Sequence, residues 1–259
     1  MGSPAKDWYR RCYTDTFAKW TLDTEPMHQQ AKAQVDFLMR QMHLRPGQAI
    51  LDVPCGTGRH AQEFAKRGLV VTGLDISPDC LRRAQKNCAG LQVTLGRADM
   101  SRLFRYRGRF DATVNLFTSF GYFPTDAANA RVMWELVSTL RPGGRIVLNM
   151  MNRDYLEKNF KPVSWQDEGD LFHLEARRYD PATKTNESRQ VVIDRGTGRG
   201  EMRPFRVRLY SKKEMVALMK KCSLRRIRVS GDFQGNPFKR FSSVRPVYLA
   251  EKPGKPRNK

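Results

Sequence analysis

Short apolar runs alternate with amphipathic stretches between residue 50 and about residue 151. The runs are rich in β-branched residues and too short for helices, which indicates buried strands. They cover residues 50–52, 69–74, 91–95, 112–117 and 145–151. Between them, apolar residues recur at helical spacing over 61–66, 78–89 and 125–140. This alternation predicts an α/β fold in which a mostly parallel sheet carries helices on both faces.

The pattern changes after residue 151. Three strand-like stretches, at 172–179, 188–193 and 204–210, are separated by turn sequences. They predict an antiparallel insertion that caps the carboxyl ends of the parallel strands, where α/β folds bind ligands. Ser211 and Glu214 then form a capping box for a helix that runs to Cys222. Strands at 224–232 and 244–252 complete a seven-stranded sheet.

An aromatic stripe marks the N-terminal segment. Four residues follow the spacing of one helical face: Tyr9, Tyr13, Phe17 and Trp20. One interpretation is a helix packed on the core. The other is a lid over a ligand, because aromatic faces attract cations and exclude water. A second helix is predicted over residues 29–42.

A glycine turn follows the first predicted strand. Asp52 ends that strand, and Gly56 and Gly58 let the backbone turn sharply into a helix whose free N–H groups face a ligand. The second strand ends in Asp75, about 20 residues past the loop, where nucleotide-binding α/β folds hold a ribose hydroxyl. Asp99 follows the third strand and reaches the same edge. These acids predict a nucleotide-like ligand.

Four segments, at 52–58, 71–77, 97–100 and 110–116, resemble the first four motifs of the Rossmann-like (class I) S-adenosylmethionine (SAM)-dependent methyltransferases. The chain departs from that family at Pro54, where a third glycine is usual. The resemblance implies SAM as cofactor, with Asp52 near its ammonium group, Asp75 on the ribose hydroxyls and Asp99 on the adenine amino group. It also assigns further cofactor contacts to Gly56, Gly58, Ile76, Met100 and Asn115.

The fourth strand leads into Phe117-Thr118-Ser119-Phe120-Gly121-Tyr122-Phe123. This run lacks the prolines of enzymes that methylate nucleobase amines and the Pro-Cys of cytosine carbon-5 enzymes. It resembles enzymes that methylate small molecules, including N-methyltransferases of amino sugars and glycine. The resemblance points to Tyr13, Phe117 and Tyr122 as substrate contacts. We also expect at least one phenylalanine of the run to be core.

Methyl transfer is an in-line displacement, so alignment and desolvation can supply most of the rate. A base is required only for an acceptor that arrives protonated. Candidates are Tyr13, His28 and His173, but no pairing is visible in the sequence and lone histidines are more often structural. No catalytic residue is assigned.

The formal net charge is +21, and the excess is greatest after residue 200. Such a field attracts polyanions, so a nucleic-acid partner is one interpretation; a solvated basic surface is the other. Arg203, Arg206 and Arg208 alternate with apolar residues, as on the wet face of a strand. The five cysteines show no metal-ligand spacing, so we predict no metal and buried thiols in a reducing compartment. No apolar run approaches a membrane span and no signal peptide is visible, so we expect a soluble, cytoplasmic chain without a membrane partner.

These observations predict a SAM-dependent methyltransferase that acts on nitrogen or oxygen of a small molecule. An RNA methyltransferase and a non-catalytic SAM-binding module are the alternatives. We divide the single domain into an N-terminal helical lid (1–28), a SAM-binding core (29–160), the antiparallel insertion (161–210), the last helix with the closing strands (211–252) and a disordered basic tail (253–259).

Overall fold

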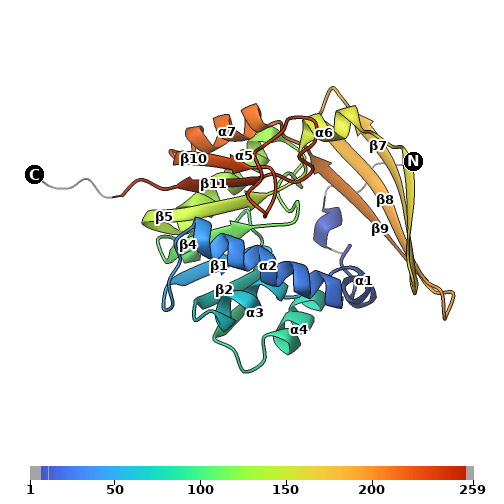
Figure 1. Cartoon of the computed structure of the whole chain (residues 1–259), viewed down its shortest axis with the longest axis horizontal. Helices are drawn as coiled ribbons and strands as arrows, with labels where there is room; N and C mark the ends of the chain where they lie inside the picture. The colour runs from blue at the N-terminus through green and yellow to red at the C-terminus, as the bar shows by residue number, and fades with distance from the viewer. Residues whose placement is uncertain (1–6, 11, 255–259) are drawn as a thin grey trace, which may run out of the picture.

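The computed structural model describes residues 7–10 and 12–254. A large sheet flanked by helices forms one body, and a second, curved sheet stands beside it (Figure 1). The N-terminal segment lies between the two (Figure 1). The outer ends of the predicted lid (residues 1–6) and of the predicted tail (255–259) fall outside the described residues.

The large sheet has seven strands in the order β10-β11-β5-β4-β1-β2-β3. Its members are β1 (Ala49–Asp52), β2 (Val70–Asp75), β3 (Val93–Arg97), β4 (Phe110–Asn115), β5 (Leu140–Asn149), β10 (Arg225–Ser230) and β11 (Val247–Glu251). Strands β1 to β5 pair in parallel, whereas β11 is antiparallel to both of its neighbours. The predicted mostly parallel, seven-stranded sheet is confirmed.

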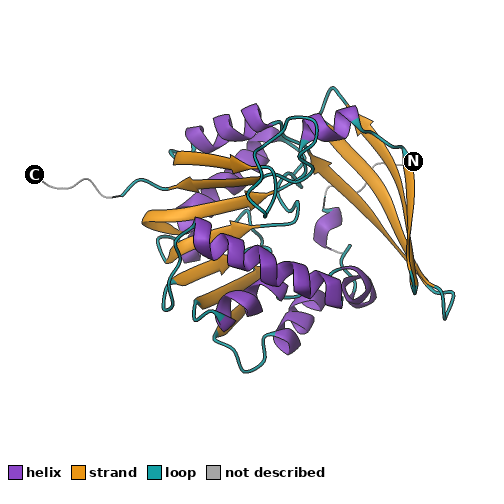
Figure 2. Cartoon of the chain, viewed as in Figure 1, coloured by secondary structure: helices purple, strands orange, loops and turns teal. Residues whose placement is uncertain are grey.

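Helices cover both faces of this sheet (Figure 2). They are α2 (Glu25–Gln41), α3 (Arg59–Lys66), α4 (Pro78–Asn87), α5 (Asp126–Thr139) and α7 (Lys212–Lys221). The short helix α6 (Arg153–Lys158) lies beside the second sheet (Figure 1). Successive residues of a strand point to opposite faces, so Ile50 joins the core beneath α2 and α3 while Leu51 joins the core beneath α5 and α7. Ser211 and Glu214 form the predicted capping box of α7. Among the described helices, none combines the length and apolar character needed to span a membrane.

The fifth strand differs from its prediction. It begins at Leu140 rather than Arg145, because the predicted turn at 141–144 is part of the strand. The pairing with β4 shifts register between Phe110 and Ala112, which accommodates the extra residues as an irregularity.

The N-terminal segment is not one helix. A 3₁₀ turn, η1 (Trp8–Arg10), is followed by α1 (Asp15–Thr21). Thr14 is extended, and its hydroxyl accepts a hydrogen bond from the N–H of Phe17 at 3.1 Å, so it caps α1 and prevents a continuous helix. The prediction of a single aromatic helical face was therefore wrong.

The insertion is a separate four-stranded antiparallel sheet, called the cap sheet below. Its strands are β6 (Val163–Glu168), β7 (Leu171–Asp180), β8 (Thr185–Asp194) and β9 (Gly200–Arg208). The sequence did not reveal β6, an almost wholly exposed edge strand, or the one-and-a-half-turn helix α6 before it. At the base of the cap sheet, Asn152 and Tyr210 form a β-bridge that joins its two ends.

Candidate functional site

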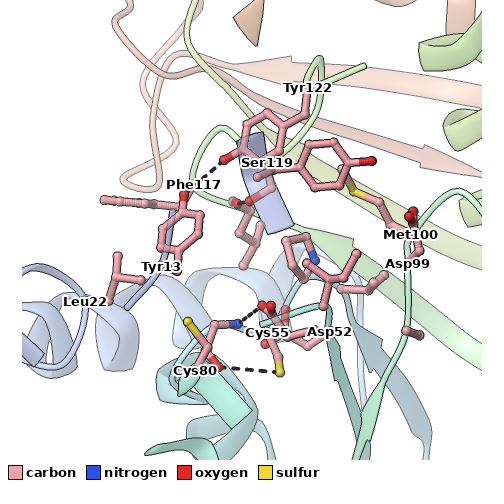
Figure 3. Close-up of a pocket in the computed structure, with 18 of the residues that line it drawn as sticks. Tyr13, Leu22, Asp52, Cys55, Cys80, Asp99, Met100, Phe117, Ser119 and Tyr122 are labelled. Atoms are coloured by element: carbon pink, nitrogen blue, oxygen red, sulfur yellow. Dashed lines mark hydrogen bonds between the residues drawn. The ribbon is translucent and has the colours of Figure 1, made fainter. Parts of the chain in front are cut away.

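A cavity opens at the carboxyl ends of β1, β2 and β4, where the strand order reverses around β1. Its volume, including the open mouth, is about 830 Å³. Figure 3 shows the acids of the strand tips at one end and the aromatic side chains of Tyr13, Phe117 and Tyr122 at the other. Of the predicted site residues, those that line the cavity are Tyr13, Asp52, Gly56, Asp75, Ile76, Asp99, Met100, Phe117 and Tyr122.

The two glycines of the loop have different roles. Both have positive φ, 54° at Gly56 and 79° at Gly58. A Cβ on Gly56 would meet no atom within 4 Å, and this residue lines the cavity. A Cβ on Gly58 would meet Sγ of Cys88 at 3.0 Å and Cβ of Ala84 at 3.1 Å. Gly58 therefore permits close packing of the loop on α4. Unlike Gly56, it does not line the cavity in which the cofactor contact was predicted.

Asp75 is fixed by the backbone around it. Its Oδ2 accepts the N–H of Gly56 and its Oδ1 accepts the N–H of Ser77, each at 2.8 Å. The hydroxyl of Ser77 donates to the carbonyl of Tyr13 at 3.0 Å, which ties the N-terminal segment to the tip of β2. Each carboxylate oxygen retains a further lone pair for a ligand hydroxyl.

Asp52 is a buried acid with a raised pKa at the tip of β1. It is 1% exposed, and its Oδ2 has no hydrogen-bond partner among the described residues. Its pKa is raised to about 8, mainly by burial; Arg59 opposes this rise, and the nearby Asp75 contributes to it. A buried carboxyl with an unpaired oxygen is suited to a cationic hydrogen-bond donor.

Arg59 is a cavity residue that the sequence analysis missed. It begins α3 directly after Gly58, and its side chain is buried. Its Nη1 donates to the carbonyl of Leu22 at 3.3 Å. Burial lowers its pKa to about 10, so it remains a cation at neutral pH. The sequence does place this basic residue at the first position of the helix that follows the glycine turn, and that position could have identified it as a ligand contact.

Asp99 already has protein partners. Its Oδ2 accepts Nη2 of Arg10 at 2.8 Å, and its Oδ1 accepts the N–H and hydroxyl of Ser101 at 2.9 and 2.7 Å. Arg10 is about half exposed, so a ligand amino group could displace it. Met100 lines the cavity beside Asp99, as Figure 3 shows.

Asn115 lies behind the loop and not in the wall of the cavity. Its side chain is fully buried behind the loop, where Nδ2 donates to the carbonyl of Val53 at 2.8 Å and contacts Sδ of Met100 at 3.8 Å. Asn115 is not among the residues that line the cavity. Through these contacts it positions the loop and Met100, and its Oδ1 has no hydrogen-bond partner among the described residues.

The hydroxyls of Tyr13 and Tyr122 meet at the aromatic end of the cavity, 3.3 Å apart (Figure 3). Burial raises the pKa of both phenols, so both stay protonated at neutral pH. Arg203 of the cap sheet stacks over the Tyr13 ring at 4.6 Å and over the Phe17 ring at 4.3 Å. Its Nη1 is buried without a partner among the described residues. Arg203 thus lies on the inner face of the cap sheet, and its predicted place on a wet strand face was wrong.

The Phe117 ring contacts two arginine side chains. Guanidinium groups stack on its ring from Arg59, at 4.5 Å, and from Arg245, at 4.7 Å. Phe117 and Thr118 have φ of 60° and 59°, a strained conformation for two residues that are not glycine. Asn149 holds them there, through hydrogen bonds to both backbone N–H groups. Phe120, by contrast, is fully buried, which confirms that part of this run is core.

The three candidate bases lie in different parts of the structure. Only Tyr13 lines the cavity. His28 lies between Asp23, 2.8 Å from Nε2, and Gln62, 2.6 Å from Nδ1, and neither it nor His173 lines the cavity. His60 does line it, but burial lowers the pKa of this histidine well below its usual value and its Nε2 is held by Gln34 at 2.7 Å. All five cysteines are buried, as expected.

Comparison with known proteins agrees with this geometry. Residues 50–144 match the family model described as a methyltransferase domain. The chain is 37% identical over 100 residues to dTDP-3-amino-3,4,6-trideoxy-alpha-D-glucopyranose N,N-dimethyltransferase of Streptomyces venezuelae, covering 39% of this chain and 41% of that one. It is 28% identical to glycine/sarcosine N-methyltransferase of Parasynechococcus marenigrum, covering 64% of this chain and 60% of that one. The matched part of the chain thus spans about two fifths of the length of the first relative and about three fifths of the length of the second.

Solved structures share the whole fold. The methyltransferase CcbJ of Streptomyces caelestis superposes with a TM-score of 0.77 at 20% identity, covering 98% of both chains. The SAM-bound amino pentose methyltransferase of calicheamicin biosynthesis from Micromonospora echinaspora gives a TM-score of 0.68 at 22% identity, covering 93% of this chain and 97% of that one. The cap sheet is therefore part of a fold that these structures share.

Proposed function

We propose that this chain, whose residues 50–144 match a methyltransferase domain and whose fold matches that of a SAM-bound methyltransferase, transfers the methyl group of SAM to an amine nitrogen of a small molecule. One observation carries the proposal: a single cavity joins the acids at the tips of β1 and β2 to a pair of buried tyrosine hydroxyls. The cofactor and an acceptor would thus both have polar partners within one cavity. The relatives named above, which include an amino-sugar and a glycine/sarcosine N-methyltransferase, favour nitrogen.

The residues at the strand tips fit SAM. When bound, SAM supplies an electrophilic methyl group on a sulfonium sulfur. Asp52, with its unpaired oxygen, would accept the ammonium group, and the buried cation of Arg59 would pair with the carboxylate. Asp75 has free lone pairs for the ribose hydroxyls. Ile76 and Met100 would flank the adenine ring.

The aromatic end would hold and align the acceptor. The hydroxyls of Tyr13 and Tyr122 can donate to or accept from an amine, which fixes the direction of its lone pair. Arg203 stacks on the Tyr13 ring and brings a fixed positive charge to this end. That charge disfavours a protonated amine, so the acceptor would lose its proton to solvent on binding. The chain then needs no general base.

The test is methyl transfer from labelled SAM to pools of amino-sugar nucleotides, small amino acids and total RNA. We expect label in a small-molecule amine. Tyr122→Phe should lower kcat about 10- to 100-fold and leave SAM affinity unchanged, because the lost hydroxyl aligns the acceptor only. The proposal would be contradicted by a product that carries the labelled methyl group on oxygen instead of nitrogen. It would also be contradicted by a Tyr122→Phe enzyme with the kcat of the wild type.

The net charge of +21 is the observation that favours RNA as the acceptor. Several arginines of the cap sheet are paired, however: Arg206 with Glu187 at 3.3 Å, and Arg208 with Glu214 at 3.0 Å. Paired charges attract a polyanion less strongly. Label in RNA, together with binding that falls steeply with salt, would replace our proposal; SAM binding without transfer to any pool would favour the non-catalytic module.

A further inference from the structure

A segment rich in arginine leads from the carboxyl ends of the parallel strands to their amino ends. It covers residues 101–109, between Met100 of the cavity and the start of β4. The two acids that flank it, Asp99 and Asp111, each pair with an arginine outside it, at 2.8 and 3.0 Å. Its four arginines and one of α5 are exposed and form no ion pair among the described residues: Arg102, Arg105, Arg107, Arg109 and Arg131. Unpaired cations gathered in this way attract a polyanion.

Two large aromatic side chains are exposed in the same region. Phe104, in the 3₁₀ turn η2 (Phe104–Tyr106), is 59% exposed, and Trp134 of α5 is 51% exposed. The guanidinium of Arg105 lies over the Phe104 ring, 5.8 Å from its centroid. Every nucleobase has a π-face that can stack on such rings, and sites for single-stranded nucleic acids combine exposed aromatic rings with basic side chains.

Hydrogen bonds hold the arginine-rich segment against α5. The N–H of Leu103 donates to Oε2 of Glu135 at 2.8 Å, and the N–H of Gly108 donates to the carbonyl of Ser138 at 2.9 Å. Glu135 follows Trp134 directly, and Ser138 lies one turn beyond Trp134 on the same face of the helix. The turn η2 therefore lies alongside the part of α5 that presents Trp134. The two aromatic residues and the five arginines thus form one surface, called the η2–α5 surface below.

We propose that the η2–α5 surface binds a single-stranded nucleic acid, as a partner and not as the methyl acceptor. Guanidinium groups match phosphates in geometry, and five of them against two aromatic rings favour a phosphate chain over a lipid layer. None of the seven residues lines the cavity, and the segment leads away from it to the amino end of β4. This inference therefore goes beyond the proposed methylation and does not depend on it.

The experiment is fluorescence anisotropy of labelled oligouridylate and oligothymidylate, each about 12 nucleotides long, with the full chain at several salt concentrations. We expect binding that weakens with salt, with a slope of log affinity against log salt of about −0.7 for each phosphate contacted. Arg105→Gln combined with Arg107→Gln should reduce that slope by about 1.4. Phe104→Ala and Trp134→Ala should each lower the affinity about fivefold or more and leave the slope unchanged, because each removes a stacking ring and no charge. The tighter oligonucleotide identifies RNA or DNA as the partner.

Two control variants match these changes. Phe241 is 43% exposed and also has an arginine over its ring, Arg240 at 4.8 Å, but it lies near α6, so Phe241→Ala should bind as the wild type does. Arg40→Gln combined with Arg45→Gln removes two exposed arginines from the end of α2, on the opposite face of the large sheet, and should leave the slope unchanged.

SAM affinity, unchanged in all of these variants, shows that each is folded. The proposal fails if neither oligonucleotide binds at about 50 mM salt. It also fails if the control variants lose as much affinity as the variants of the η2–α5 surface, because the net charge of +21 would then act without a defined site. Binding to phosphatidylglycerol vesicles that depends on Phe104 and Trp134, without binding to either oligonucleotide, would replace the proposal with a membrane contact.

Discussion

The buried carboxyl of Asp52 predicts that SAM binding depends on pH. In the free protein, burial raises the pKa of Asp52 to about 8, so the group is mostly protonated at pH 7. The proposed contact with an ammonium group requires the carboxylate. Binding must therefore release a proton, and the affinity should rise with pH until the pKa of the free protein is passed.

The magnitude follows from that pKa. At pH 7, ionising a group of pKa about 8 costs about 1.4 kcal/mol, which is tenfold in affinity. At pH 6 the cost is about twice as large, so the dissociation constant for SAM should change about tenfold per pH unit between pH 6 and 7.5. Above about pH 8 the trend should reverse, because an α-amino group has a pKa near 7.7–8.0 and loses its own proton.

Isothermal titration calorimetry measures this directly, and two buffers of different ionisation enthalpy give the number of protons released. We expect nearly one proton at pH 7. Asp52→Asn should remove the pH dependence and weaken SAM binding at pH 7.5 by about 10- to 100-fold, since a charged hydrogen bond contributes about 1.5–3 kcal/mol. Methylthioadenosine, which lacks the amino-acid part of SAM, is the control ligand and should show no slope. A wild-type affinity for SAM that is flat from pH 6 to 7.5 would refute the reasoning.

Three further changes test other parts of the structure. Arg59→Met should weaken SAM about 10- to 100-fold by calorimetry while methylthioadenosine binds as before; equal losses for both ligands would contradict a carboxylate contact. Gly121→Ala should lower the melting temperature far more than Gly143→Ala, because its Cβ would lie 2.3 Å from the carbonyl of Arg208 whereas that of Gly143 meets nothing within 4 Å; similar losses would refute this. Glu214→Gln should destabilise the chain at neutral pH, because ion pairs and hydrogen bonds, including those from Arg208 and Ser211, hold the pKa of this carboxyl below 4.5. That stability is present above pH 4.5 and is lost as the pH falls through the lowered pKa, so the difference in melting temperature should shrink in acid; a constant difference would argue against it.

The sequence predicted the elements whose signals are local. In the sequence, strands β1 and β2 are apolar runs that each end in an acid. These acids, Asp52 and Asp75, identified the edge of the sheet at which the cavity opens. The capping box of α7 was equally clear, because two side chains at fixed spacing satisfy the helix end. Each of these depends on interactions within a few residues.

The features that the sequence did not predict depend on distant contacts. Strand β6 is held by pairing with β7 and has little apolar pattern of its own. Asn115 follows the motif but is drawn away from the cavity by the carbonyl of Val53, 62 residues earlier. Arg203 appeared to belong to an exposed face, and only the packing of α1 against β9 places it beside Tyr13 and Phe17. No local pattern encodes such contacts.

The bridge between Asn152 and Tyr210 has a consequence for how such chains diverge. The polypeptide leaves the core at one of these residues and returns at the other, so the whole excursion between them is a loop whose ends already touch. A closed loop of this kind tolerates insertion, deletion or replacement at a small entropic cost, because its ends keep their separation. Exchange of this segment would replace Arg203 beside Tyr13 and leave Tyr122, Asp52 and Asp75 in place, so the charge at the aromatic end of the cavity can change without altering the strand tips.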